Sequence, residues 1–179
     1  SYLVSTFKSQ AGIVISASHN SYEDNGIKFF DDKGQKISDE IELLIEQKIS
    51  EEITVVEPER LGKAARLNDA SGRYIEYCKN SLSQQISFAG LKIVLDTANG
   101  AAYDVAPKVF RELGAEVVAI SNNPDGLNIN KNCGSTDLNF LKKAVLDSNA
   151  DFGIAFDGDG DRLIIIDSDA KALDGDDIL

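Results

Sequence analysis

The sequence lacks any apolar run near the roughly 20 residues that a membrane-spanning helix needs. Its opening segment, SYLVSTFKSQ, also lacks the basic region and the long apolar core of a signal peptide. These two absences argue against a membrane protein and against a secreted one. We therefore expect a cytoplasmic protein.

Cysteine is scarce, because Cys78 and Cys133 are the only two in the chain. They lie far apart and do not form a CxxC motif, so the sequence encodes neither a disulfide framework nor a zinc site. We expect two reduced and partly buried thiols.

Positive charge is also in short supply. The chain has 18 Lys and Arg residues against 30 Asp and Glu residues, which gives a formal net charge of −12. A field of this sign repels the phosphates of nucleic acids and the headgroups of anionic lipids. The composition therefore disfavours nucleic-acid and membrane-surface partners.

What is present suits a folded protein: 42% of the residues are hydrophobic and 27% are charged. The length of 179 residues predicts one large domain, or one domain with part of another. The first residues already form an apolar stretch without a starting methionine, and the final GDDIL is typical of the start of a helix. We expect both ends to be cut from a longer protein.

In the first half, two short apolar runs at 12–15 and 26–30 are predicted strands, joined by a polar loop. A helix is predicted to begin after Ser38 or Asp39. Its apolar residues recur at helical spacing, which predicts a face packed against a core: Ile41, Leu44, Ile45 and Ile49. An irregular connector and a second helix, at about 69–82, are expected to follow.

From Leu91 onward, apolar strands alternate with helices. Strands are predicted at 92–95, 116–120, 152–156 and 163–166, with one helix closed by Gly114 and another capped by Thr136. Strands that are apolar almost throughout are typical of a parallel sheet covered on both faces. The predicted fold class is therefore α/β, with mixed or parallel sheets sandwiched by helices.

An acidic loop gives the strongest local signal: Asp157, Asp159 and Asp161 alternate with glycines between two predicted strands. Such a loop can direct three carboxylates onto one hard cation such as Mg²⁺. An EF-hand is excluded, because Arg162 and Ser168 stand where that motif needs glycine and glutamate. A solvated turn rich in Asp and Gly is the alternative.

A second polar loop, Ser16-Ala-Ser-His-Asn20, directly follows a predicted strand. The residues argue against a hydrolase triad, because Ser18 and His19 are adjacent in extended backbone and no G-x-S-x-G motif surrounds the serine. The loop can simply hydrogen-bond its own backbone. Alternatively, the hydroxyl of Ser18 carries a phosphoryl group, whose transfer requires a divalent cation and nearby positive charge.

Positive side chains for such a transfer are Lys28, Arg162 and His19. Lys28 has a second interpretation, as an edge-strand lysine that keeps the sheet from aggregating.

An ordered set of motifs runs through the whole chain: GIVISASHN, DNGIKFF, GKAARLNDASGRYIEYCK, LKIVLDTANGAAY, LGAEV, PDGLNIN, GSTD and FDGDGDR. In this order they resemble the α-D-phosphohexomutase superfamily. The resemblance implies that Ser18 is phosphorylated in the active enzyme and that Asp157, Asp159 and Asp161 hold Mg²⁺ together with Ser18. It implies that Arg162 and Lys28 lie beside the phosphoserine, with Lys28 a candidate for proton transfer. His19 and Asn20 complete the serine loop.

The implied reaction is the interconversion of glucosamine 6-phosphate and glucosamine 1-phosphate, through a phosphoserine and a glucosamine 1,6-bisphosphate. It would supply precursors of cell-wall amino sugars. A phosphomannomutase or phosphoglucomutase remains an alternative, as does a non-catalytic module that binds Mg²⁺ and phosphate. One departure is Ser21, which stands where the family usually has proline and removes a restraint on the backbone.

The resemblance also implies a division of the chain. Residues 1–70 would be the latter part of the first domain, 71–170 the second domain with the metal loop, and 171–179 the start of a third. The loops that grip the sugar in later domains have no counterpart here, so the chain alone is expected to be inactive.

Overall fold

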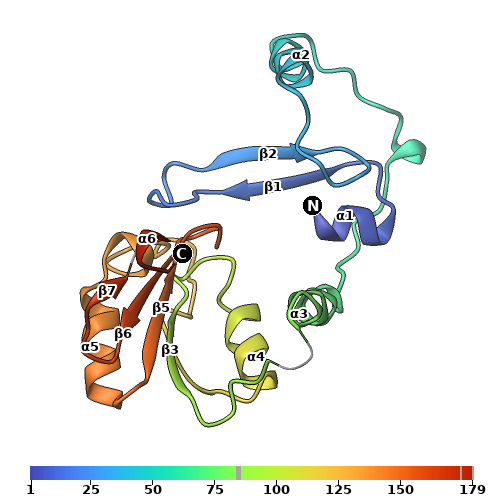
Figure 1. Ribbon diagram of the computed structural model, residues 1–179. Coiled ribbons are helices and arrows are strands. Elements are labelled where there is room, and N and C mark those ends of the chain that lie inside the picture. Colours follow the sequence, from blue (N-terminus) through green and yellow to red (C-terminus); the bar gives the residue numbers. More distant parts are fainter. Residues whose placement is uncertain (84–85, 174, 179) are drawn as a thin grey trace. The chain divides into compact units, whose positions relative to one another are not determined.

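The computed structural model describes residues 1–83, 86–173 and 175–178. The chain divides into two units, each drawn as part of the ribbon in Figure 1. Unit 1 comprises residues 1–14 and 28–70, and unit 2 comprises residues 15–27 and 71–179. The segment 15–27, which carries the serine loop, is therefore part of unit 2.

Unit 1 begins with helix α1 (Tyr2–Phe7). Strands β1 (Gly12–Ser16) and β2 (Gly26–Phe30) form a two-stranded sheet whose tip belongs to unit 2. Helix α2 (Asp39–Ile49) and a 3-10 turn at Pro58–Arg60 follow. Both predicted strands and the predicted helix α2 are confirmed, whereas α1 lies where no element was predicted.

The apolar face of α2 does not have the predicted packing. The exposed fractions of Ile41, Leu44 and Ile49 are 46%, 59% and 74%. With Ile45, Lys48 and Ile53 they line an open groove of about 420 Å³. Val4 is the only buried large hydrophobic residue in the described part of unit 1, so the expectation that α2 faces a core is wrong for this chain. The helical spacing correctly gave the stripe, but spacing alone does not show what covers it.

Unit 2 is built around a five-stranded sheet with the order β4-β3-β5-β6-β7. β4 (Glu116–Ile120), β3 (Lys92–Asp96) and β5 (Phe152–Phe156) are parallel. β6 (Leu163–Asp167) and β7 (Ala172–Leu173) add to the edge in antiparallel fashion. The sheet is thus mixed, as the fold class predicts.

The three longer helices in this part of the chain are α3 (Ala70–Asn80), α4 (Val105–Glu112) and α5 (Asn139–Ser148). Helix α4 is followed by Gly114, whose φ of +101° favours glycine, as predicted. Thr136 does not cap α5, so that prediction is wrong. It lies in the 3-10 turn Gly134–Thr136, where its hydroxyl donates to the carbonyl of Cys133, and α5 begins three residues later.

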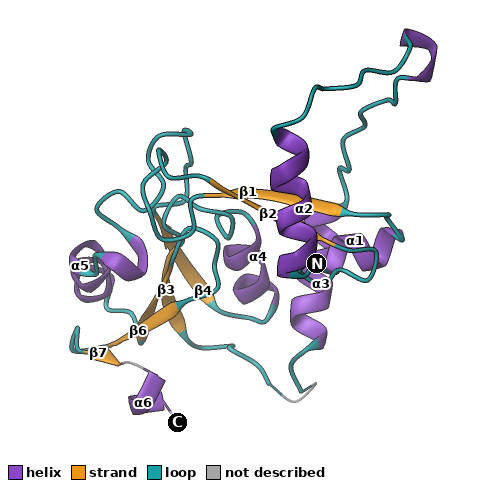
Figure 2. Cartoon of the chain, turned by 90° about the horizontal axis from the view of Figure 1, so that it is seen from above, coloured by secondary structure: helices purple, strands orange, loops and turns teal. Residues whose placement is uncertain are grey.

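Alternate residues of the central strands feed two cores on opposite faces of the sheet. Ile93, Leu95 and Ile154 pack with Ala106 of α4. Val94, Ala155 and Ile166 pack with Leu141 and Val145 of α5. Figures 1 and 2 show α4 and α5 on either side of the strands. This two-faced core gives the ends of β3 and β5 a rigid support.

The short helix α6 (Gly175–Ile178) confirms the helical start predicted from GDDIL. Asp174 and Leu179, which belong to the expected third domain at 171–179, lie outside the described residues. Among the helices of the described residues, none has the length and apolar character that crossing a membrane requires.

Candidate active site

The acidic loop joins β5 to β6 and folds around its first carboxylate. Asp157 Oδ1 accepts hydrogen bonds from the backbone N–H groups of Gly160, Asp161 and Arg162, at 3.0, 3.2 and 3.2 Å. Gly160 has a φ of +74°, a conformation that favours glycine. The Asp-Gly alternation therefore specifies a tight loop in which one aspartate shapes the backbone.

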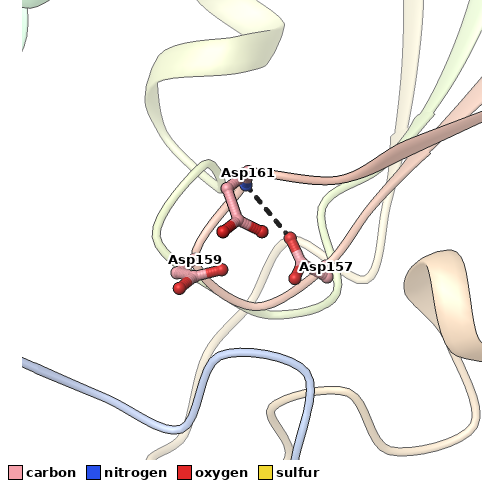
Figure 3. Close-up of side chains that lie close together, drawn as sticks. All are labelled: Asp157, Asp159 and Asp161. Carbon is pink, nitrogen blue, oxygen red and sulfur yellow. Dashed lines mark hydrogen bonds between the residues drawn. The ribbon is translucent and has the colours of Figure 1, made fainter.

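The same loop brings three carboxylates together, as Figure 3 shows. Ligand oxygens of Asp157, Asp159 and Asp161 all lie within 4.8 Å of one another. Asp157 is fully buried, and within the described residues its Oδ2 has no hydrogen-bond partner. Burial raises the pKa of Asp157, and the charges of Asp159 and Asp161 raise it further, against the lowering effect of the Arg162 N–H.

A buried oxygen without a donor beside two further carboxylates is electrostatically costly unless a cation joins them. All three groups offer hard oxygen donors, which suit Mg²⁺ or Ca²⁺. The side chains present therefore fit a divalent cation.

The serine loop begins where β1 ends. The N–H of Ser18 donates to Ser16 Oγ at 3.0 Å, and the N–H of Asn20 donates to the carbonyl of Ala17 at 2.9 Å. Ser18 has a φ of +52°, which is strained for a residue other than glycine. Ala17 is buried, whereas Ser18 is half-buried. This turn fixes the backbone and leaves the serine side chain accessible.

The serine loop and the acidic loop are in direct contact within unit 2. A side chain at Gly158 would place its Cβ 2.3 Å from the carbonyl oxygen of Ser18. Only glycine lets the two backbones approach this closely. The structure thus brings the predicted phosphate carrier beside the predicted metal ligands, although about 140 residues of chain separate them.

The predicted positive side chains have different positions. His19 is exposed, and its Nδ1 lies 3.4 Å from Ser18 Oγ. Arg162 is 58% exposed, with Nε 4.0 Å from Asp161 Oδ1. Lys28 is exposed on β2 in unit 1, so its place beside Ser18 stays a prediction.

Two segments to which the sequence analysis assigned no function also contact the two loops of the site. The N–H of Ala101 donates to the carbonyl of Gly158 at 2.8 Å, and a Cβ at Gly100 would lie 2.2 Å from that oxygen. Asn130 Nδ2 donates to the carbonyls of Ser18 and Asn20 at 2.8 and 2.7 Å. The first segment could have been found from its position directly after β3, because ligands in α/β sheets bind at the carboxyl ends of the strands.

Asp96 ends β3 and is fully buried. Its carboxylate accepts the N–H groups of Ala98 and Gly134 at 3.0 and 2.9 Å. Burial raises its pKa, and these two hydrogen bonds oppose that effect. Asp96 therefore ties together the turn after β3 and the loop that precedes α5.

The two cysteines are free, as predicted: Cys133 is buried and Cys78 is half-buried. Burial raises the pKa of the Cys133 thiol, and the nearby charge of Asp96 raises it further. A buried thiol held in its neutral form is a poor nucleophile and a poor metal ligand.

Comparison with known families matches almost the whole chain. Residues 72–171 match the family described as phosphoglucomutase/phosphomannomutase, alpha/beta/alpha domain II. Residues 1–55 match alpha/beta/alpha domain I of the same description. Domain I thus precedes domain II along the chain, as the order of the sequence motifs predicts.

Curated relatives are similar over nearly the full sequence. A phosphoglucosamine mutase of Pseudomonas fluorescens Pf-5 is 60% identical over 178 residues, which cover 99% of this chain and 40% of that protein. A phosphoglucosamine mutase of Pseudomonas entomophila L48 is 58% identical with the same coverage. The chain thus spans 40% of the length of these relatives.

Solved structures share the fold. A phosphoglucomutase/phosphomannomutase family protein from Burkholderia thailandensis is 28% identical with a TM-score of 0.67, over 90% of this chain and 34% of that one. A protein from Thermus thermophilus, 24% identical, has a TM-score of 0.78 over 97% of this chain and 40% of that one. These likenesses and the mixed sheet confirm the predicted α/β fold class.

Proposed function

The chain belongs to the phosphoglucomutase/phosphomannomutase family, and we propose that the protein containing it interconverts glucosamine 6-phosphate and glucosamine 1-phosphate. The choice of sugar rests on the 58–60% identity to proteins named phosphoglucosamine mutase. A small sugar phosphate as partner and a cytoplasmic location are parts of the same proposal.

One observation carries the proposal: the Ser18 loop and the acidic loop lie against each other in a single unit. Either loop alone has an ordinary structural interpretation. Their contact at Gly158 supports the proposal that Ser18 carries a phosphoryl group close to three carboxylates that can hold a cation. A non-catalytic phosphate-binding module has no need for an accessible hydroxyl at this point.

The proposed reaction has two transfers. In the first, the P–O bond of phosphorylated Ser18 breaks and a bond to O1 of glucosamine 6-phosphate forms. The O1 hydroxyl loses its proton, and the serine hydroxyl is restored. In the second, the P–O6 bond of the resulting 1,6-bisphosphate breaks and a bond to the oxygen of Ser18 forms, while the proton of the serine hydroxyl passes to O6. Glucosamine 1-phosphate leaves, so phosphate is neither gained nor lost.

Charge balance assigns the other proposed roles. Asp157, Asp159 and Asp161 would hold Mg²⁺, which, when bound, neutralises charge on the transferring group. Arg162 and His19 would add positive charge beside the serine phosphate. Lys28 would accept or return the proton of the sugar hydroxyl.

The domain assignment is part of the proposal too. Residues 1–70 would form the latter part of the family's domain I, 71–170 its domain II, and 171–179 the start of a third domain. The matches at 1–55 and 72–171 support the first two assignments.

The test is a coupled assay on the full-length protein with Mg²⁺ and a glucosamine 1,6-bisphosphate primer. Glucosamine 6-phosphate, glucose 6-phosphate and mannose 6-phosphate are compared by kcat/KM. We expect the glucosamine substrate to give the highest value. A higher value for glucose or mannose phosphate would reassign the enzyme within its family, and no turnover of any of the three would overturn the proposal.

A further inference from the structure

The geometry points to Asn130 as a positioning residue that holds the Ser18 loop against the acidic loop. This inference rests on the proposed function, because it assigns Asn130 a part in phosphoryl transfer from Ser18. Asn130 belongs to the loop between β4 and α5 and is distant in sequence from both motifs.

The side-chain amide of Asn130 donates two hydrogen bonds, both to the serine loop. Nδ2 lies 2.8 Å from the carbonyl oxygen of Ser18 and 2.7 Å from that of Asn20. An amide nitrogen carries two hydrogens, so both bonds form together. Rotating the amide by 180° would set its oxygen against two carbonyl oxygens, and the two acceptors therefore fix its orientation.

The backbone of Asn130 is itself anchored to the core of unit 2. Its N–H donates to the carbonyl of Ala98 at 2.9 Å. Ala98 is fully buried, and its own N–H donates to Asp96 at the end of β3. Asn130 has a φ of +56°, which asparagine tolerates better than most residues. Asn130 and its hydrogen bonds to Ala98, Ser18 and Asn20, here called the Asn130 clamp, thus connect the central sheet to the serine loop.

Gly158 closes the arrangement from the other side. A Cβ at this position would lie 2.3 Å from the Ser18 oxygen and 2.8 Å from Asn130 Nδ2. The Ser18 carbonyl is thus enclosed by the acidic loop and by the amide that donates to it. Because the carbonyls of Ser18 and Asn20 flank His19, the two bonds restrain the backbone on both sides of that residue.

The two hydrogen bonds from Asn130 are expected to affect the rate of phosphoryl transfer, because they hold Ser18 in position. Ser18 has a strained left-handed backbone, which persists only when its surroundings enforce it. Without the Asn130 amide, the loop can relax and turn the phosphate carrier away from the metal ligands. A misplacement of about 1 Å can cost about a hundredfold in rate. Asn130 does not itself touch the sugar in this account, so substrate affinity should change little.

The test uses the full-length protein with Asn130→Gly and the matched control Asn132→Gly. Both asparagines have positive φ, at 56° and 54°, so glycine suits both backbones. Asn132 is exposed, and within the described residues no side-chain hydrogen bond is found for it. Measurements are kcat per phosphorylated Ser18, KM for glucosamine 6-phosphate, the melting temperature, and hydrogen exchange of residues 15–27.

We expect Asn130→Gly to lower kcat per phosphoserine by about 10- to 100-fold, with KM changed by less than about threefold. Exchange across 15–27 should become faster, and Asn132→Gly should resemble wild type in both respects. If Asn130→Gly fails to fold, Asn130→Asp, similar in size but without the donors, is expected to show the same loss.

Wild-type kcat and wild-type exchange in folded Asn130→Gly would overturn the inference, and so would equal losses in Asn132→Gly. A fall in activity that merely follows a lower melting temperature, with unchanged exchange at 15–27, would also overturn it. If the wild-type protein has no mutase activity, the proposed function fails. Faster exchange confined to Asn130→Gly would then still establish the Asn130 clamp, whereas unchanged exchange would reject it.

Discussion

Unit 1 leaves most of its large apolar side chains exposed, whereas unit 2 buries a cluster of them on each face of a five-stranded sheet. The contrast is clearest between two helices. The apolar stripe of α2 lines an open groove, but Leu141 and Val145 of α5 are fully buried. Both helices have amphipathic sequences, so the difference lies in what each helix packs against.

The comparison shows where a precise site can be built. The acidic loop, Asn130 and the turn after β3 all emerge from the well-packed sheet of unit 2. The serine loop comes from the tip of a two-stranded sheet, which is marginal by itself. Its contacts with Gly158 and Asn130 give it the rigidity that its own strands cannot supply.

The largest expected effect is at Ser18 of unit 2, the proposed phosphate carrier. In the full-length protein, Ser18→Ala should lower mutase activity by at least about a thousandfold, because no other group replaces a covalent carrier. The melting temperature should change little, since Ser18 lies in a loop. Ser21→Ala, at an exposed position of the same loop, is the control and should remain active. Substantial turnover by Ser18→Ala would remove the chemistry from this loop.

The acidic loop should show the next largest effect. Asp159→Asn keeps the shape of the side chain but removes one charge from the three-carboxylate cluster. We expect Mg²⁺ affinity, measured by calorimetry on the full-length protein, to fall by about tenfold or more. Asp169→Asn, in an exposed turn outside the cluster, should bind as wild type does. Equal affinity in the two variants would make the acidic loop a solvated turn.

Stability should separate the two units. In the 179-residue chain, Leu141→Ala should lower the free energy of unfolding by about 2–5 kcal/mol, because it opens a cavity in a fully buried core. Leu44→Ala on α2 should change it by less than about 0.5 kcal/mol, since that side chain is 59% exposed. Denaturant titration measures both. A large loss for Leu44→Ala would contradict the contrast between the units.

An effect smaller than that of Leu141→Ala is expected at the buried carboxylate of unit 2, Asp96. Asp96→Asn should destabilise the chain by about 1–3 kcal/mol at neutral pH, because the amide places a donor against one of two N–H groups. Burial raises the pKa of Asp96 in the folded state, so the folded chain keeps its proton at pH values where the unfolded chain has lost it.

The contribution of Asp96 to stability is therefore highest at low pH and falls as pH rises through the raised pKa. The advantage of wild type over Asp96→Asn should grow as pH is lowered from neutral toward the ordinary pKa of aspartate. Denaturant titrations at several pH values measure this difference. A difference that does not vary with pH would mean that burial leaves the Asp96 pKa unshifted.

The sequence predicts much of the local structure, because strands and helices leave short-range patterns. The runs at 12–15, 26–30 and 152–156 became strands within a residue of their expected ends. The prediction that Thr136 caps a helix was wrong, because a threonine hydroxyl can form a hydrogen bond in a 3-10 turn as well as at a helix start. The helical stripe of α2 was predicted correctly, but its packing was not.

The candidate site is predictable only in part, for a related reason. Alternating acids mark the acidic loop, and they converge because Asp157 folds the backbone around itself. The bond from Asn130 to Ser18 joins residues 112 positions apart, and no local pattern encodes such a contact. Likewise, Gly158 looks like a flexible spacer in the sequence, but it is the point at which two loops touch.

The most direct test of a phosphoryl-transfer site at these two loops is to locate the phosphate. The full-length protein is incubated with glucosamine 1,6-bisphosphate, with and without Mg²⁺, and analysed by intact mass and peptide mapping. One phosphoryl group on Ser18, formed faster with Mg²⁺ and absent from Ser18→Ala, is the predicted result. Mutase turnover with no phosphate on Ser18, or with phosphate on another residue, would contradict the account.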